Sequence, residues 1–205
     1  QTDVAPLKGN YIDLLNIVNS PDFELTTAAD IISRDTALTI DLLKMVQPLA
    51  VNSEITSIRH AAAMLGQLEL KKWINTAVAN ALYADKPNEV TRLSLLRAKF
   101  AENLAEAFGL KAQKDELFLM GLFSVLDVIL EKPMAEALKV VHVAGEISNA
   151  LIYRIGVLAP VYDFMLQYET ANWAEVSRLM LLKNIDMNTV YEAYTSALKW
   201  YRTVR

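Results

Sequence analysis

Residues 117–130, LFLMGLFSVLDVIL, form the longest nearly apolar stretch of the chain. A transmembrane helix needs about 20 apolar residues, so this stretch is too short to cross a bilayer, and Ser124 and Asp127 interrupt it. Its leucines and methionine favour helix. The polar run that ends in Pro133 terminates it. We therefore expect a single buried core helix from Asp115 to about Leu130.

The composition of the whole chain indicates an all-α fold. Of its 205 residues, 53% are hydrophobic, which is enough for one sizeable core. Only six glycines and six prolines occur, whereas β-rich folds need many turns. The apolar residues are mostly leucine, alanine, methionine and isoleucine, so we expect a compact multi-helix bundle.

Charge and cysteine content exclude several classes of protein. The net charge is −4, and the basic residues are interleaved with acidic ones, whereas a nucleic-acid binder usually carries a basic stripe. The absence of cysteine excludes disulfides, thiolate metal sites and cysteine nucleophiles, and it fits the cytoplasm. No stretch reaches about 18 apolar residues without a charge. We expect neither a nucleic-acid partner nor membrane insertion.

Apolar residues at helical spacing recur along the whole chain. The run at residues 85–88, Asp-Lys-Pro-Asn, is the clearest turn in its first half. We treat residues 1–205 as a single domain with two lobes, 10–85 and 88–205, that share one core. A long helix is expected over residues 89–108, with Gly109 as its C-cap. The candidate N-caps in the first lobe are Thr26 or Thr27, Asp35, and Thr56 or Ser57.

Three stretches in this order resemble one known family, the HDOD domain, an output domain related to the HD-type metal phosphohydrolases. They are AADIISRDTALT at 28–39, which runs into LLKMV at 42–46; ITSIRHA at 55–61, which leads to MLG at 64–66 and LKKW at 70–73; and FLMGLFSVLD at 118–127. The resemblance covers nearly the whole chain. It implies an HD-superfamily-like bundle with a helical N-terminal lobe.

Two further stretches sharpen the resemblance. Pro133-Met134 and YETANW at 168–173 are similar to the HDOD half of bacterial proteins that carry an EAL-type cyclic di-GMP phosphodiesterase domain upstream. This similarity implies a regulatory or interaction module in bacterial cytoplasmic signalling. The implied partners are other signalling proteins, including its own EAL domain or two-component proteins. The chain starts at Gln1 without an initiator methionine, so we expect an EAL domain before it in a longer protein.

The resemblance also implies where a catalytic site would lie, and the required ligands are missing there. HD-type hydrolysis uses a divalent ion held by a histidine, a later His-Asp pair and a further aspartate, and this ion activates water. The His-Asp pair would fall on Phe123 and Ser124, and the first histidine near residues 93–94. The only two histidines, His60 and His142, are not followed by aspartate. We expect no catalysis, no metal and no cofactor.

A remnant of that site would comprise Phe123, Ser124 and Asp127. A carboxylate in an apolar stretch needs a partner, so Asp127 is expected to form a hydrogen bond or an ion pair, with Arg97 or Lys99 as candidates. The alternative is a remnant pocket that binds a small ligand, such as a nucleotide, or a partner side chain. A residual phosphohydrolase is the third function considered.

Two surface features are candidate interaction sites. Trp173 follows Asn172 at an expected helix start, where a tryptophan is often exposed, and tryptophan is enriched among residues that dominate binding energy. Lys71 and Lys72 form a small positive spot. The lysines are interpreted either as a solvated face or as a contact for an acidic partner.

Overall fold

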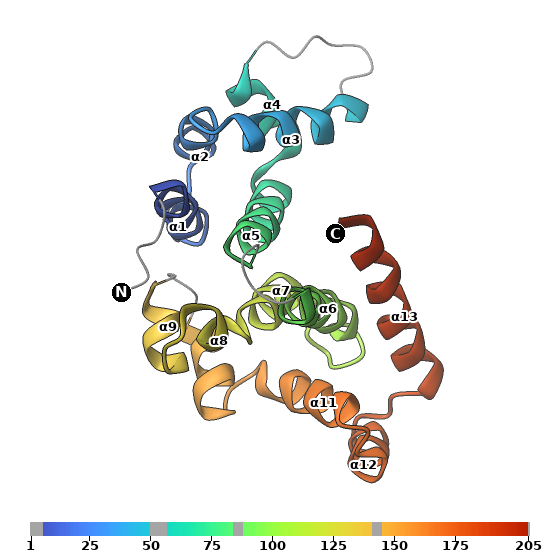
Figure 1. Ribbon diagram of the computed structural model, residues 1–205. Coiled ribbons are helices and arrows are strands. Elements are labelled where there is room, and N and C mark those ends of the chain that lie inside the picture. Colours follow the sequence, from blue (N-terminus) through green and yellow to red (C-terminus); the bar gives the residue numbers. More distant parts are fainter. Residues whose placement is uncertain (1–5, 50–56, 84–87, 141–144, 205) are drawn as a thin grey trace. The chain divides into compact units, whose positions relative to one another are not determined.

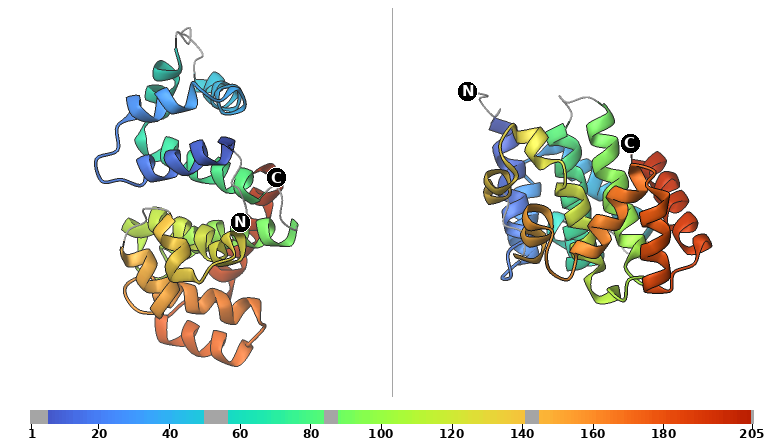
Figure 2. Two further views of the ribbon diagram at one scale, coloured as in Figure 1. Left: turned by 60° about the vertical axis from the view of Figure 1, so that its left-hand side comes forward. Right: turned by 90° about the horizontal axis from the view of Figure 1, so that it is seen from below.

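The computed structural model of the chain describes residues 6–49, 57–83, 88–140 and 145–204 (Figure 1). Within these ranges every regular element is a helix, which confirms the all-α prediction. Two further views show the same helices from the side and from below (Figure 2). None of the helices in the described ranges is both long enough and apolar enough to span a bilayer.

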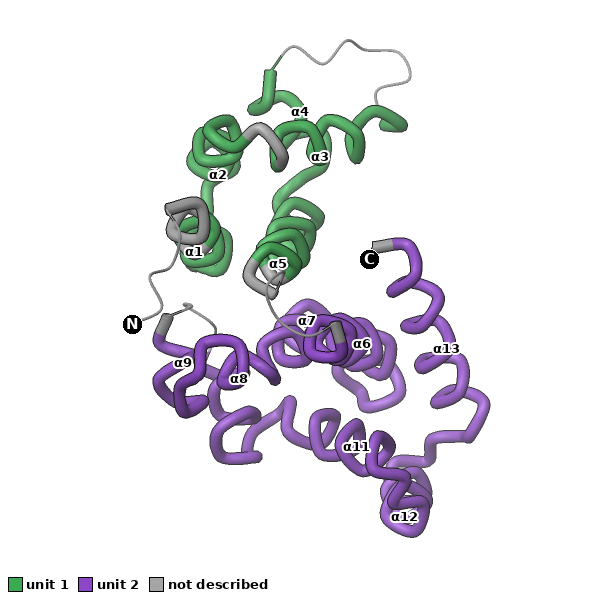
Figure 3. Tube along the Cα trace, in the orientation of Figure 1, with its two compact units in different colours: residues 1–82 green, residues 83–205 purple. Residues whose placement is uncertain are grey.

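The chain divides into two compact units, residues 1–82 and 83–205 (Figure 3). The division falls close to residues 85–88, where the sequence predicts a turn; residues 85–87 lie outside the described ranges, and Asn88 begins the next helix. A single domain with one shared core remains a prediction. The two units are described separately below.

The first unit consists of short helices that enclose a small aliphatic core. It contains α1 (Pro6–Val18), α2 (Leu25–Ile32), α3 (Thr36–Val46), a 3-10 turn (Gln47–Leu49), α4 (Ile58–Leu65) and α5 (Gln67–Tyr83), the last of which ends at the division. Leucines, isoleucines, valines and alanines at helical spacing are buried, because each helix turns its apolar face inward. The largest fully buried side chains are Leu14, Leu15, Ile32, Leu42, Leu70 and Ile74.

Side-chain caps start two of these helices as the sequence predicts. Asp35 accepts a hydrogen bond from the backbone N–H of Leu38 at 3.0 Å, and Ser57 accepts one from the N–H of His60 at 2.9 Å. Both bonds satisfy N–H groups that have no partner within the helix. The expected cap at Thr26 or Thr27 is wrong: α2 begins at Leu25, and its N-cap residue makes no side-chain capping bond.

The second unit is larger and is organised around α6 (Asn88–Leu104). The other elements follow along the chain: a 3-10 turn (Lys111–Gln113), α7 (Lys114–Phe123), α8 (Leu126–Leu130), α9 (Met134–Val140), α10 (Gly145–Ser148), a π-helical turn (Asn149–Tyr153), α11 (Ala159–Glu169), α12 (Trp173–Lys183) and α13 (Met187–Val204). Helix α6 packs most extensively against α7 and α13 and also contacts α11 (Figure 1). Helix α6 therefore brings residues from three distant segments together.

A glycine allows α6 and α7 to cross at very short range. A Cβ atom at Gly121 would lie 2.4 Å from the backbone carbonyl of Arg97 and 2.5 Å from the backbone nitrogen of Ala98. Such distances are well inside van der Waals contact, and both neighbours are backbone atoms that cannot rotate away. Glycine at this position therefore sets the spacing of the two helices.

The apolar stretch at residues 117–130 does not form one helix. Helix α7 ends at Phe123, and α8 begins at Leu126. At the junction the backbone N–H of Ser124 bonds to the carbonyl of Gly121, three residues back, which tightens the last turn. The expectation of one helix from Asp115 to about Leu130 is therefore wrong, and the break lies in the middle of the apolar run.

The end of α6 also differs from the prediction, because the helix stops earlier than expected. The expected helix over residues 89–108 stops at Leu104 and continues as turns to Gly109. Gly109 does adopt the left-handed conformation that was predicted for it, with a φ of 70°. The last turn of the expected helix is therefore not α-helical, and the chain changes direction at Gly109.

Candidate functional site

The junction between α7 and α8 is held by two buried serine hydroxyls. Ser94, on α6, donates a hydrogen bond from Oγ to the carbonyl of Leu122 at 2.7 Å. Ser124 donates from its own Oγ to the carbonyl of Gly121 at 2.7 Å. Carbonyls at a helix end lack partners within the helix, and these two hydroxyls supply hydrogen bonds to two buried carbonyls at the end of α7. Both serines are at least 94% buried.

An arginine of α6 lies next to this junction and connects it to α11. Arg97 donates from Nε and Nη2 to the two carboxylate oxygens of Glu169, each at 2.8 Å. Its third group, Nη1, donates to Ser124 Oγ at 3.1 Å. The side chains of Arg97 and Glu169 are 12% and 25% exposed. A bidentate pair of this kind is strong and directional, and here it is largely removed from water.

The electrostatic environment favours the charged form of this arginine. Burial alone lowers the pKa of Arg97, but the hydrogen bonds and the negative charge of Glu169 more than offset it, so the pKa is raised from its ordinary value. Asp127 adds a weaker contribution in the same direction. The guanidinium is therefore a permanent cation beside Ser124, one of the positions where the family resemblance would place metal ligands.

The three residues expected as a site remnant have separate roles. Phe123 is 1% exposed and belongs to the core, and Ser124 bonds to a carbonyl and to Arg97. Asp127 is half-buried in the first turn of α8, where its carboxylate forms no hydrogen bond or ion pair within the part of the chain that the structure describes. The candidate cations pair elsewhere, Arg97 with Glu169 and Lys99 with Glu102. The expected pairing of Asp127 with either of them is therefore wrong.

An open groove runs along the face of α6 that carries Arg97. Its volume is about 370 Å³, which is near the lower end of the range for small-molecule sites, about 300–1,000 Å³. Helix α6 supplies one side, and α11 and α13 each contribute one residue. The groove is lined by Glu89, Arg92, Leu93, Leu96, Arg97, Phe100, Glu169 and Tyr194.

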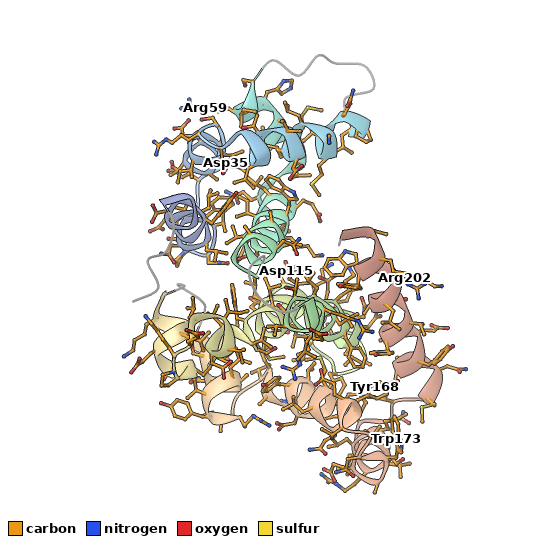
Figure 4. The ribbon with its side chains drawn as sticks, viewed as in Figure 1. Asp35, Arg59, Asp115, Tyr168, Trp173 and Arg202 are labelled. Carbon is orange, nitrogen blue, oxygen red and sulfur yellow. The ribbon has the colours of Figure 1, made fainter. Side chains whose placement is uncertain are left out.

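A chain of aromatic rings connects this groove to the surface. Phe100 contacts Tyr168 and Tyr194, with ring centroids 5.4 Å apart in both pairs. Tyr168 in turn meets the edge of Trp173 at 5.5 Å, and the two rings lie together where α11 leads into α12 (Figure 4). Burial raises the pKa of the Tyr168 hydroxyl. Trp173 is 54% exposed, so one end of the chain of rings faces solvent.

The remaining predicted residues lie away from this groove. Lys71 and Lys72 are half-buried on α5, in the first unit. His60 lies on α4, and His142 falls outside the described residues. Across the described ranges no group of three or more histidine, aspartate or glutamate side chains is arranged to hold a metal ion.

Sequence reasoning missed Glu169 and Tyr194 as neighbours of Arg97. Glu169 is 72 residues away from its partner along the chain, and no local pattern connects the two. The one available signal was its position in the YETANW stretch at 168–173, which the family resemblance had already singled out. That stretch contains both the partner of Arg97 and the exposed Trp173.

Comparison with known proteins points in one direction. The family model for the HDOD domain matches residues 4–150. The cyclic di-GMP phosphodiesterase CdgJ of Vibrio cholerae is 29% identical over 206 aligned residues, which cover 100% of this chain and 48% of that protein. The uncharacterized protein YuxH of Bacillus subtilis is 27% identical over 93% of this chain and 47% of its own length. The chain thus spans about half the length of these relatives, and no solved structure matches it.

Proposed function

Because the chain belongs to the HDOD domain family, we propose that it is a non-catalytic regulatory module of bacterial cyclic di-GMP signalling, acting in the cytoplasm by contacts with other signalling proteins. The relatives CdgJ and YuxH are about twice as long as the chain. The proposed arrangement is an EAL domain upstream of this module, either as its direct partner or as the enzyme whose output it modulates.

One observation supports the absence of catalysis most directly. A metal-dependent phosphohydrolase needs imidazole and carboxylate ligands that converge on an ion. At the positions that the family resemblance assigns to such ligands, the chain has Ser94 and Ser124, and both hydroxyls donate to backbone carbonyls. The charge beside them is the guanidinium of Arg97, which would repel a divalent cation. A residual phosphohydrolase is for this reason the least supported function.

The catalytic part of the proposal is tested on the purified chain. We expect substoichiometric manganese, iron and zinc by mass spectrometry after incubation with each metal. We also expect no hydrolysis of cyclic di-GMP or of a simple phosphodiester beyond that of a sample treated with chelator. Stoichiometric metal together with turnover that chelation abolishes would refute the proposal.

The interaction part is tested on the longer protein that contains an EAL domain. Trp173 is the best candidate anchor, since an exposed tryptophan held by a neighbouring ring loses little entropy on binding. Deleting residues 1–205, or changing Trp173→Ala, is expected to alter the phosphodiesterase rate. Tyr153→Ala is the matched control, because Tyr153 is also an exposed aromatic residue of the same unit, at 65% against 54% for Trp173. Equal rates in all four proteins would contradict the proposal.

Lys71 and Lys72 are proposed as a secondary contact for an acidic partner. They are half-buried on α5, and long lysine side chains in such positions commonly pack their aliphatic stems and keep their charges near the surface. The double change to glutamine should weaken binding of the same partner in low salt and have less effect in high salt. An effect that is independent of salt would point to packing and not to charge.

A second candidate function is a sensor of a small ligand. The observation that favours it is the groove along α6, which combines two arginines with an apolar floor. Screening nucleotides for a rise in the melting temperature tests it, because a ligand that binds only the folded state raises that temperature.

A further inference from the structure

The groove along α6 has the chemistry of an anion site that is occupied by the chain's own carboxylate. We propose that it binds a phosphate-bearing ligand with an apolar body, such as a nucleoside diphosphate, and that the ligand displaces Glu169 from Arg97. This inference rests on the proposal that the chain is a sensor of a small ligand. It adds the chemical class of that ligand and identifies the carboxylate of Glu169 as the group that competes with it.

Two arginines of α6 line the groove. Arg97 presents two donors to Glu169, each at 2.8 Å, in the fork geometry that also suits a phosphate. Arg92 lines the same groove and is exposed, and its guanidinium has no hydrogen bond or ion pair with any residue that the structure describes. A phosphate that replaced the carboxylate would gain this second cation.

Arg97 is anchored at the α7–α8 junction. Its Nη1 group donates to Ser124, whose hydroxyl is fixed by the carbonyl of Gly121. Loss of Glu169 would therefore leave the guanidinium attached to the α7–α8 junction and still directed at the groove. An arginine that is held independently of its carboxylate partner can exchange that partner for another anion at low cost in side-chain entropy.

The body of the ligand would lie on an apolar surface. Leu93, Leu96 and Tyr194 give the groove a largely apolar lining between the charged residues. A free phosphate ion would leave this surface uncovered. A nucleoside would cover it and gain hydrophobic contact, and the carboxylate of Glu89 at the same groove could accept hydrogen bonds from base N–H groups.

The exchange of Glu169 for a phosphate would affect α11 and Trp173. Glu169 ends α11 and follows Tyr168, which contacts Trp173 at the start of α12. Release of the carboxylate would loosen the attachment of α11 to α6 and thereby disturb the aromatic contact that holds Trp173. Ligand binding in the groove and the exposed tryptophan are thus connected through four bonded or stacked residues.

The test uses isothermal titration of the chain with GDP, pyrophosphate and guanosine. Since Glu169 competes with the ligand, Glu169→Gln should bind GDP at least about tenfold more tightly than the wild type, in line with loss of one charge-assisted contact. Arg92→Ala should bind at least about tenfold more weakly. The matched control is Arg178→Ala, on the exposed surface of α12, which should bind like the wild type.

The outcomes separate cleanly. A purely structural Glu169 predicts equal or weaker binding in Glu169→Gln, so that result would overturn the proposal. Guanosine binding as tightly as GDP, or no saturable binding of GDP by either protein, would overturn it as well. If Glu169→Gln fails to fold, as circular dichroism would reveal, the difference between Arg92→Ala and Arg178→Ala decides. Failure here leaves the regulatory proposal standing, because the rate of the linked EAL domain tests that proposal separately.

Discussion

Two arginine–carboxylate pairs of the same geometry occur in the two units of the chain, and they differ in exposure to water. Arg59 on α4 holds Asp30 on α2 through three contacts of 2.9–3.2 Å, with side chains 61% and 50% exposed. Arg97 holds Glu169 at 2.8 Å, with side chains 12% and 25% exposed. The two ion pairs therefore have similar geometry but differ in how much water surrounds their charges.

The comparison teaches that geometry alone does not rank these contacts. An exposed pair gains little, since water competes for both charges and salt screens them. A buried pair gains more Coulomb energy but has lost its hydration, so removing one partner leaves the other charge stranded. We expect the first pair to be nearly neutral for stability and the second to resist single substitutions strongly.

The largest expected effect follows from breaking the less exposed pair, Arg97–Glu169. Arg97→Met keeps the aliphatic stem but leaves Glu169 without its partner and removes the donor to Ser124, and it should cost about 2 kcal/mol of unfolding free energy. Urea unfolding followed by circular dichroism measures this loss. The double variant Arg97→Met with Glu169→Leu should recover most of it, because no buried charge remains. A double variant as unstable as the single one would contradict the role given to burial.

A smaller effect is expected from removing the hydrogen bond that Ser94, an uncharged residue, donates at the α7–α8 junction. Ser94→Ala removes the hydroxyl donor to the carbonyl of Leu122, and the loss of one hydrogen bond should cost about 1 kcal/mol. The same urea experiment measures it, with Ser196→Ala on the exposed surface of α13 as the control. A loss equal to that of the control would mean that water or another donor serves the carbonyl.

Burial of Tyr162, which interacts electrostatically with Arg97, should also make the free energy of unfolding depend on pH. Burial raises the pKa of Tyr162, and the positive charge of Arg97 acts in the opposite direction. Because the pKa is raised in the folded state, the associated stability is complete below the unfolded value of about 10 and is lost as the pH rises through the folded value. We expect the unfolding free energy to fall above about pH 10, and to fall less in Tyr162→Phe. Identical profiles would exclude Tyr162 as the cause.

The smallest effect is expected at the exposed pair. Arg59→Ala should cost about 0.2–1 kcal/mol at low ionic strength and less in concentrated salt. Unfolding in low and high sodium chloride measures both values. A loss as large as that of Arg97→Met would show that exposure does not separate the two pairs, and the comparison would fail.

The sequence was sufficient for those features that depend on local spacing. Apolar periodicity predicted helices throughout the chain, and Asp35 and Ser57 were recognised as caps because a cap acts on residues three positions away. The resemblance to the HDOD domain was also correct, since its motifs are continuous stretches.

The features that were missed depend on partners distant in sequence. The break at Ser124 is supported by a hydroxyl of α6 and by a helix crossing that only Gly121 permits, and neither is visible in an apolar run. Asp127 was a candidate site residue because it is the only acidic residue in the stretch 117–130. The acid that pairs with Arg97 is Glu169, which looked like an ordinary surface residue at a helix end.

The close crossing at Gly121 has a consequence for how the second unit moves. Backbone atoms of α6 and α7 lie so near each other there that a methyl group would not fit between them, so the amides in the crossing cannot reach solvent unless the helices separate. Slow exchange of these amides with deuterium should therefore appear in both helices together. Motion that accompanies binding must then come from α11 to α13, with the crossing as the fixed frame against which they shift.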